Sequence, residues 1–158
     1  NLSIDWVLMK DLYPKQLEIA QAVAAMLGDV GIKVNIRNLE IATAREQRSA
    51  GDYHIFFSGW AHMPHDPDWY FGQWFTRAGA EKLTRYSNPK VEQLVAEGRV
   101  PDAKVRQRKY EELQRILWEE EPEIWPYYSV AIYGVSDKRR GFEARGDYYV
   151  LLSEVSVS

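Results

Sequence analysis

The chain has 158 residues, enough for one domain that buries roughly 70% of the surface its unfolded form would expose. It is 46% hydrophobic and 27% charged with a net charge of −3, which is ordinary for a folded domain and gives no electrostatic reason to expect a nucleic acid or an anionic membrane as partner. The absence of cysteine excludes disulfides, thiol catalysis and thiolate metal sites.

The first 60 residues alternate between strand and helix patterns. The order is strand, helix, strand, helix, strand, over residues 2–9, 14–27, 32–37, 43–49 and 54–60. This order predicts a parallel sheet with right-handed crossovers. Apolar and polar residues alternate in the second strand, which indicates an edge position or one wetter side.

The remaining chain is mainly helical in pattern. Asp66-Pro67-Asp68 predicts a helix start, because aspartate caps well, proline suits the first position and a second carboxylate favours the positive helix end. Its aromatic residues are expected in a core, with a docking face or a wall toward a second lobe as the alternatives; they are Trp69, Tyr70, Trp74 and Phe75. The other expected elements are a loop over 78–84, a helix from Asn88, a long helix over 101–121, a Tyr-rich strand over 124–135 and a further strand after residue 141. The acidic cluster over residues 119–123 is expected to be solvated, and His54 to be structural.

The most informative stretch follows the third predicted strand. There the apolar run ends in Gly59-Trp60, continues into a polar loop over residues 61–65 and closes on Asp66-Pro67-Asp68. Ligand contacts in α/β proteins collect at strand ends of this kind. Trp60 either stacks on a ligand or packs in the core at a strand end, and the sequence leaves both interpretations open.

Four groups of residues, in a fixed order, are more specific together than any of them alone. They are Leu27 with Gly31-Ile32 and Val34; Gly51-Asp52-Tyr53 with Gly59-Trp60 and Asp66-Pro67-Asp68; Tyr86-Ser87-Asn88-Pro89 with Val91; and residues 108–117 with Glu121-Pro122 and Pro126-Tyr127-Tyr128. In this order they resemble the C-terminal lobe of ABC-transporter solute-binding proteins of the peptide/nickel class, extracellular family 5.

The resemblance implies a fold and a function. The expected fold is α/β, a parallel-rich mixed sheet with flanking helices, forming the C-terminal lobe of a two-lobed periplasmic-binding-protein-like fold of class II. Residues 1–158 would form this single lobe of a longer protein, with 136–158 returning toward the other lobe. The implied function is that of the substrate-binding component of an ABC importer, which captures a peptide-like or other small solute between lobes and delivers it to permease subunits. The implied location is the periplasm, or the cell exterior on a membrane tether.

The resemblance also indicates ligand-binding residues: Trp60, Ala61, His62, Met63 and Arg48. In peptide-binding relatives, an aspartate at the position of Met63 holds the free α-amino group of the peptide. A buried ammonium needs an opposite charge, which methionine cannot supply. The amine anchor is therefore missing here unless His62, His65 or Asp66 replaces it. Arg48 either faces the cleft, where it could pair with a carboxylate, or is a solvated helix residue.

Other classes of function find less support in the sequence. Two histidines and two aspartates within residues 62–68 could be read as a metal cluster, but the aspartates are better explained by the helix start, so no metal or cofactor is expected. Ser58-Gly59 lacks the nucleophile-elbow pattern and there is no phosphate-binding loop, so no enzyme is expected. No apolar run approaches the ~20 residues that span a bilayer, and no membrane insertion of this segment is expected. The alternative function is a stand-alone, non-catalytic sensor or interaction domain with the same fold.

Overall fold

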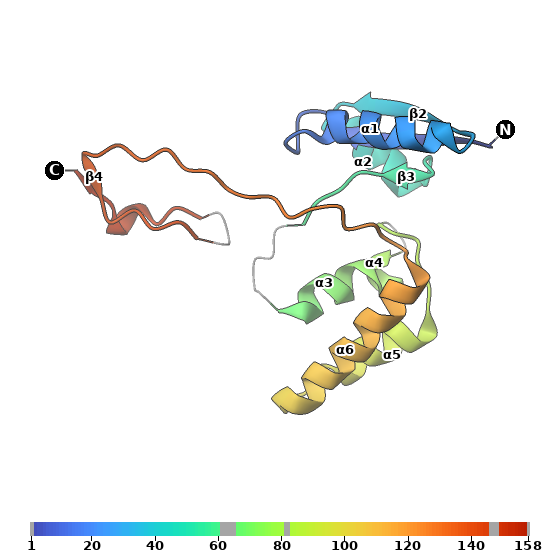
Figure 1. Cartoon of the computed structure of the whole chain (residues 1–158). Coiled ribbons are helices and arrows are strands. Elements are labelled where there is room, and N and C mark those ends of the chain that lie inside the picture. Colours follow the sequence, from blue (N-terminus) through green and yellow to red (C-terminus); the bar gives the residue numbers. More distant parts are fainter. Residues whose placement is uncertain (1, 61–65, 81–82, 146–148, 158) are drawn as a thin grey trace. The chain divides into compact units, whose positions relative to one another are not determined.

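A computed structural model describes residues 2–60, 66–80, 83–145 and 149–157 (Figure 1). Contacts group these residues into two compact units. The first unit contains residues 2–60 and Gly72–Glu92, and the second contains residues 66–71 and the described part of the chain from Gln93 onward. Whether the chain acts as one lobe stays a prediction.

The first unit is built on a parallel sheet, as the alternating pattern predicted. Strands β1 (Leu2–Met9), β2 (Ile32–Leu39) and β3 (Ile55–Phe56) lie in the order β2-β1-β3. β1 pairs with β2 along its whole length, and with β3 at two positions. The edge position of β2 confirms the interpretation of its polar alternation. β3 is shorter than the predicted 54–60, although the Phe57 amide still donates to the Val7 carbonyl at 2.9 Å.

Two helices cover opposite faces of this sheet (Figure 1). Trp6 and Leu8 point to α1 (Gln16–Asp29), where they pack with Ala20. The alternate residues Val7 and Met9 pack with Ala44 of α2 (Ile41–Ala50). A strand buried on both faces reads as a nearly continuous apolar run, which is the pattern of β1 from Trp6 to Met9. The fold class is therefore α/β with a parallel sheet and flanking helices.

The start of α1 and the loop after α3 differ from the sequence expectation for physical reasons. α1 begins at Gln16 rather than at Pro14, because Lys15 adopts a left-handed conformation (φ 59°) that a helix interior excludes. The predicted loop over 78–84 is wrong at its start, where α4 (Arg77–Ala80) forms one helical turn. Gly79 fits there because its α-carbon lies against the Gln73 carbonyl, where a β-carbon would come within 2.0 Å of the oxygen. A turn this short carries no helical periodicity.

Helices α3 (Pro67–Trp74) and α5 (Pro89–Glu97) each contribute residues to both units. Both start where the sequence predicts. The Asp66 carboxylate accepts a hydrogen bond from the Asp68 amide at 2.8 Å, and the Asn88 side-chain oxygen accepts one from the Lys90 amide at 2.9 Å. The expected core role is confirmed for Trp74 and for Phe75 directly after α3, which are buried, whereas Trp69 is exposed.

The second unit is organised by α6 (Ala103–Glu120), the long predicted helix. Asp102 caps it by accepting from the Lys104 and Val105 amides at 2.9 and 3.0 Å. One apolar stripe of the helix is buried. Its members are Tyr110, Leu113 and Leu117. Within the described ranges of the chain, no helix is long and apolar enough to cross a membrane.

The chain after α6 departs most from the sequence expectation. The predicted strand over 124–135 is wrong: this segment is extended but joins no sheet within the described part of the chain. Its side chains include Tyr128, which is 97% exposed. A strand pattern without a partner strand does not make a sheet. A short antiparallel ladder pairs β4 (Arg139–Arg140) with β5 (Ser156–Val157), and a 3₁₀ turn, η1 (Leu152–Glu154), replaces part of the predicted tail strand.

The acidic cluster at the end of α6 is solvated, except for one carboxylate. Glu119, Glu120 and Glu121 are exposed, as predicted. Glu123 is half-buried instead: the Tyr70 hydroxyl donates to its Oε2 at 2.5 Å, and the Trp125 indole donates to the Tyr70 oxygen at 3.2 Å. Burial raises the pKa of Glu123 above its ordinary value of 4.5, against the opposing effect of the Tyr70 hydrogen bond. The expectation that Glu123 is solvated is therefore wrong. Residue composition does not show that Glu123 contacts Tyr70, which is distant in the sequence.

We expect Glu123→Gln to change how stability depends on pH. A raised pKa in the folded state means that the folded protein holds this proton more tightly than the unfolded one. The stability contribution of Glu123 is therefore fully present below pH 4.5 and is lost as the pH rises through the raised folded value. Glutamine keeps an oxygen that accepts from Tyr70 but does not ionise. Thermal unfolding of the full-length protein from pH 4 to 7 should show the wild type losing stability relative to the variant.

The matched control is Glu119→Gln, at an exposed position of α6. Its pH profile should follow that of the wild type. Parallel profiles for wild type and Glu123→Gln across this range would contradict the assignment of a buried, proton-binding Glu123.

Candidate functional site

The candidate site lies at the carboxyl edge of the parallel sheet. Because β1 and β3 run in the same direction, the chain leaves both strands at this edge, which is where open α/β sheets bind ligands. The loop after β1 covers residues 10–15, and the loop after β3 begins with residues 57–60. A hollow of about 610 Å³ opens at the same edge, lined by residues 11–18 and Asn38.

The two loops are joined by Tyr13. Its hydroxyl donates to the Gly59 carbonyl at 3.2 Å, and its ring lies 5.9 Å from that of Phe57. A β-carbon at position 59 would lie 2.7 Å from the Tyr13 ring. Glycine is therefore required at position 59 by the close approach of the tyrosine.

Trp60 packs against a core residue and is also partly exposed. Its ring meets that of Trp74 edge to face, with centroids 5.5 Å apart and an interplanar angle of 85°. The residue nevertheless stays 37% exposed, whereas Trp74 is buried. Trp60 is thus supported from the core side and retains an accessible surface on which a ligand could stack. Its role in binding stays a prediction.

Arg48 lies in the last turn of α2 and is not a fully solvated side chain. It is half-buried, with its guanidinium carbon 5.2 Å from the centre of the Phe56 ring, in cation–π geometry. Burial lowers the pKa of Arg48, with smaller effects from Tyr53, Arg45 and Tyr13. Within the described part of the chain its buried Nε has no hydrogen-bond partner. A half-buried guanidinium with unused donor capacity is suited to an anionic partner. That binding role also stays a prediction.

The other predicted ligand residues cannot be placed. Ala61, His62 and Met63 lie outside the described residues, as does His65. Asp66, which was considered as a replacement amine anchor, forms an ion pair with Arg106 in addition to its helix-start role. Its carboxylate is therefore already committed within the second unit.

The aspartates of the proposed metal alternative have other partners. Asp68 accepts from Arg99 at 2.8 Å and from the Tyr110 hydroxyl at 3.2 Å. Burial, followed by the Asp68 charge, raises the pKa of Tyr110 to about 12. In the described ranges, no group of three or more histidine, aspartate or glutamate side chains is placed to hold a metal ion.

His54 is structural, as predicted. Its ring Nδ1 accepts a hydrogen bond from the Asp5 amide at 3.0 Å, and its own amide donates to the Asp5 carbonyl at 3.0 Å. The ring thus satisfies a backbone donor beside β1, at the end of β3 opposite to Trp60.

Comparison with known proteins identifies a family whose model matches this sequence. The family model for the bacterial extracellular solute-binding proteins, family 5 Middle, matches residues 6–82, a range that contains Tyr13, Arg48, Gly59 and Trp60. The chain belongs to family 5 of the bacterial extracellular solute-binding proteins. The earlier resemblance is confirmed.

Individual relatives of family 5 share either sequence or fold with the chain. The probable di/tripeptide-binding protein 5 of Pseudomonas aeruginosa (strain UCBPP-PA14) is 30% identical over 105 residues, which are 64% of this chain and 20% of the relative. The structure of Haemophilus influenzae OppA in complex with RPPGFSPFR has a TM-score of 0.80 at 22% identity, over 99% of this chain and 31% of OppA. A dipeptide-binding protein from Pseudoalteromonas sp. SM9913, in complex with Met-Leu, has a TM-score of 0.76 at 20% identity, over 100% of this chain and 32% of the other.

The coverage and identity values show how much of these proteins the chain matches. The chain spans about a fifth of the length of the curated relatives that it matches first. The two solved structures are below 25% identity and establish the common fold.

Two residues of the candidate site are not indicated by the sequence. Tyr13 contacts Gly59 and Trp74 contacts Trp60. The sequence predicts only that Tyr13 lies next to a helix start and that Trp74 is a core residue. One signal could have identified Tyr13: an aromatic residue directly after the first strand, at the edge where the predicted parallel topology also brings Gly59. No sequence signal pairs Trp74 with Trp60.

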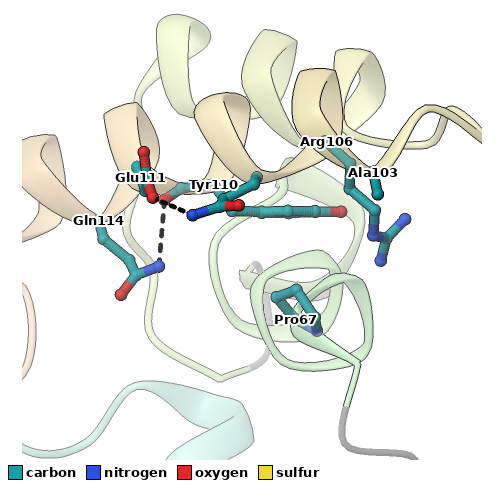
Figure 2. Close-up of a pocket in the computed structure, with 7 residues that line it drawn as sticks. Pro67, Ala103, Arg106, Tyr110, Glu111 and Gln114 are labelled. Carbon is teal, nitrogen blue, oxygen red and sulfur yellow. Dashed lines mark hydrogen bonds between the residues drawn. The ribbon is translucent and has the colours of Figure 1, made fainter.

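A second hollow lies on the second unit of this family 5 chain and carries no comparable chemistry (Figure 2). It measures about 500 Å³ and is lined by Pro67 and one face of α6. The polar side chains of that face satisfy each other and the helix: Gln107 donates to Glu111 at 2.7 Å, and Gln114 donates to the Tyr110 carbonyl at 3.2 Å. These are ordinary contacts between residues four apart on a helix.

Proposed function

We propose that the full-length protein is the substrate-binding component of an ABC importer and captures a peptide or similar small solute between two lobes. The bound form would then be presented to permease subunits at the membrane, from the periplasm or the cell exterior. No bond is made or broken in this function. The observation that carries the proposal is the family 5 match across the carboxyl-edge site.

Named relatives favour a peptide as the solute. The Pseudomonas relative is a probable di/tripeptide-binding protein, and the two solved structures hold RPPGFSPFR and Met-Leu. The solved structures of this fold also include NikA from Staphylococcus aureus in complex with Ni(L-His)2, so the fold alone does not choose the ligand. The choice rests on the side chains at the edge.

Those side chains suit a ligand with a carboxylate and an apolar group. The Arg48 guanidinium has an unused donor, and Trp60 presents an accessible aromatic surface. Met63 replaces the aspartate that holds a peptide amine in relatives, and methionine contributes a polarizable apolar surface instead. We therefore propose that the carboxylate contributes more to recognition than the free amine does.

Isothermal titration of the full-length protein with three forms of one tripeptide tests this proposal: the free peptide, its N-acetylated form and its C-amidated form. We expect the free and N-acetylated forms to bind within about threefold of each other. Amidation should weaken binding by about tenfold, the cost of a lost hydrogen bond to a charged group. The opposite order would show that an amine anchor exists. Absence of binding across a panel of di-, tri- and oligopeptides would contradict the peptide proposal.

Trp60→Ala should weaken peptide binding by about two- to tenfold, since an aromatic contact contributes about 0.5–1.5 kcal/mol beyond simple burial. Titration calorimetry measures the change. The matched control is Trp118→Ala, which removes a tryptophan that is 71% exposed on α6 and should leave affinity unchanged. Equal affinities of wild type and Trp60→Ala would remove Trp60 from the binding site.

A further inference from the structure

We propose that Tyr13 is a positioning residue that sets the orientation of Trp60 at the carboxyl edge of the sheet. Its importance for ligand binding rests on the proposed function. The orientation itself is a property of the free protein and can be measured without a ligand.

The contact between Tyr13 and Gly59 has two independent parts. The Tyr13 hydroxyl donates to the Gly59 carbonyl at 3.2 Å, and the tyrosine ring occupies the space that a side chain at position 59 would need. Gly59 does not have the positive φ that would by itself favour glycine. The close approach of Tyr13 is therefore the observed reason for glycine at this position, and it fixes the backbone directly before Trp60.

Tyr13 itself is held firmly. It packs against the buried clusters on both faces of the sheet, those around Leu8 and around Val7. Its loop is also closed from within: the buried Gln16 side chain donates to the Met9 carbonyl, and the Leu12 amide donates to the same oxygen at 3.2 Å. A residue anchored at both faces can transmit its position to the neighbouring loop.

The backbone around Tyr13 is constrained in an unusual way. Asp11 and Lys15 both adopt left-handed conformations, with φ of 56° and 59°. Such conformations are unfavourable for residues with a β-carbon and persist where the surrounding structure determines them. Their positions on either side of Tyr13 indicate that the loop is built to hold this residue in place.

On the other side, Trp60 is also supported by a ring contact. The Trp74 ring meets it edge to face. Trp60 is thus held through its backbone by Tyr13 and through its ring by Trp74, while part of its surface stays accessible. Of these two supports, only Tyr13 comes from the loop after β1.

The test uses full-length protein labelled with 5-fluorotryptophan, with the Trp60 resonance assigned by Trp60→Phe. Tyr13→Phe keeps the ring and loses the hydroxyl, and Tyr13→Leu loses both. We expect the Trp60 fluorine resonance of the free protein to shift slightly in Tyr13→Phe, and to shift further or broaden in Tyr13→Leu. The Trp118 resonance should stay unchanged. Peptide affinity should fall about two- to fivefold in Tyr13→Phe, the cost of one neutral hydrogen bond.

The matched control is Tyr53→Phe. Tyr53 is another tyrosine of the first unit, and its hydroxyl donates to the Leu83 carbonyl at 2.8 Å. Removing the Tyr53 hydroxyl also breaks one tyrosine-to-carbonyl hydrogen bond, but away from Gly59. The Trp60 resonance should therefore stay at its wild-type position.

An unchanged Trp60 resonance in both Tyr13 variants, with either one folded, would overturn the positioning role. The positioning role would also be overturned if Tyr53→Phe shifted the Trp60 resonance as far as Tyr13→Phe does. If the wild type bound no peptide, the proposed function would fail, and the fluorine spectra of the free protein would still decide whether Tyr13 orients Trp60.

Discussion

Replacing Arg48 with methionine should weaken the binding of a carboxylate-bearing peptide to the full-length protein by about 10- to 100-fold, because hydrogen bonds to charged groups contribute about 1.5–3 kcal/mol. Methionine keeps an apolar chain over the Phe56 ring, so the packing that the arginine stem provides is largely retained. The lost interaction is then mainly that between guanidinium and carboxylate. Since the Arg48 Nε has no partner among the described residues, its replacement breaks no hydrogen bond of that nitrogen.

The signature of this effect is a loss of discrimination between ligands. Wild-type protein should prefer the free peptide over its C-amidated form, and Arg48→Met should bind both with similar affinity. Arg45→Met is the matched control, because Arg45 lies on α2 one turn earlier and is exposed. Titration calorimetry on the three proteins measures this preference. An unchanged preference for the free peptide in Arg48→Met, or an equal loss of that preference in Arg45→Met, would contradict a carboxylate-binding Arg48.

The sheet of the first unit could be predicted because each of its strands carries a local signal. β1 is apolar on both faces and β2 alternates, so their central and edge positions follow from the sequence. The starts of α3, α5 and α6 were predictable for a related reason. A side chain next to the helix caps each one, and these contacts span only two or three residues.

The region after α6 was predicted poorly because its structure depends on distant partners. The Tyr-rich run over 124–135 has the composition of a strand, but a strand also needs a neighbouring strand. Glu123 sits in an acidic run that reads as solvent-exposed, yet it is paired with Tyr70, far away in the sequence. No local pattern reports a contact of this kind.

In the candidate site, too, residues in sequence motifs were predictable, whereas contacts between separate elements were not. Gly59-Trp60 and Arg48 could be named from the sequence because they occupy motif positions. Tyr13 and Trp74 could not be paired with them, because each contact joins residues from separate elements. The environment of Arg48 was also beyond the sequence, since its stacking on Phe56 follows from the crossing of α2 over β3.

The prediction with the largest effect on stability concerns Leu8, a fully buried residue of the central strand β1. Leu8→Ala should destabilise the first unit by about 2–5 kcal/mol, since truncation of a buried leucine costs transfer free energy and leaves a cavity. Leu8 packs with Ala20 of α1 and with Phe57, so little of that cavity can be refilled without moving the sheet or the helix. Leu2→Ala is the matched control: Leu2 begins the same strand but is 59% exposed, and its truncation should cost less than about 1 kcal/mol.

Hydrogen exchange of the β1 and β2 amides in the full-length protein measures these costs locally, where global unfolding need not be two-state. The effect of Leu8→Ala should reach the candidate site through Met9, which directly follows Leu8. The Met9 carbonyl accepts hydrogen bonds from the Leu12 amide and from the Gln16 side chain, and both bonds hold the Tyr13 loop. The amides of residues 10–13 should therefore exchange faster in Leu8→Ala and at the wild-type rate in Leu2→Ala. Faster exchange in the strands with unchanged exchange in this loop would show that the loop is held independently of the core beneath it.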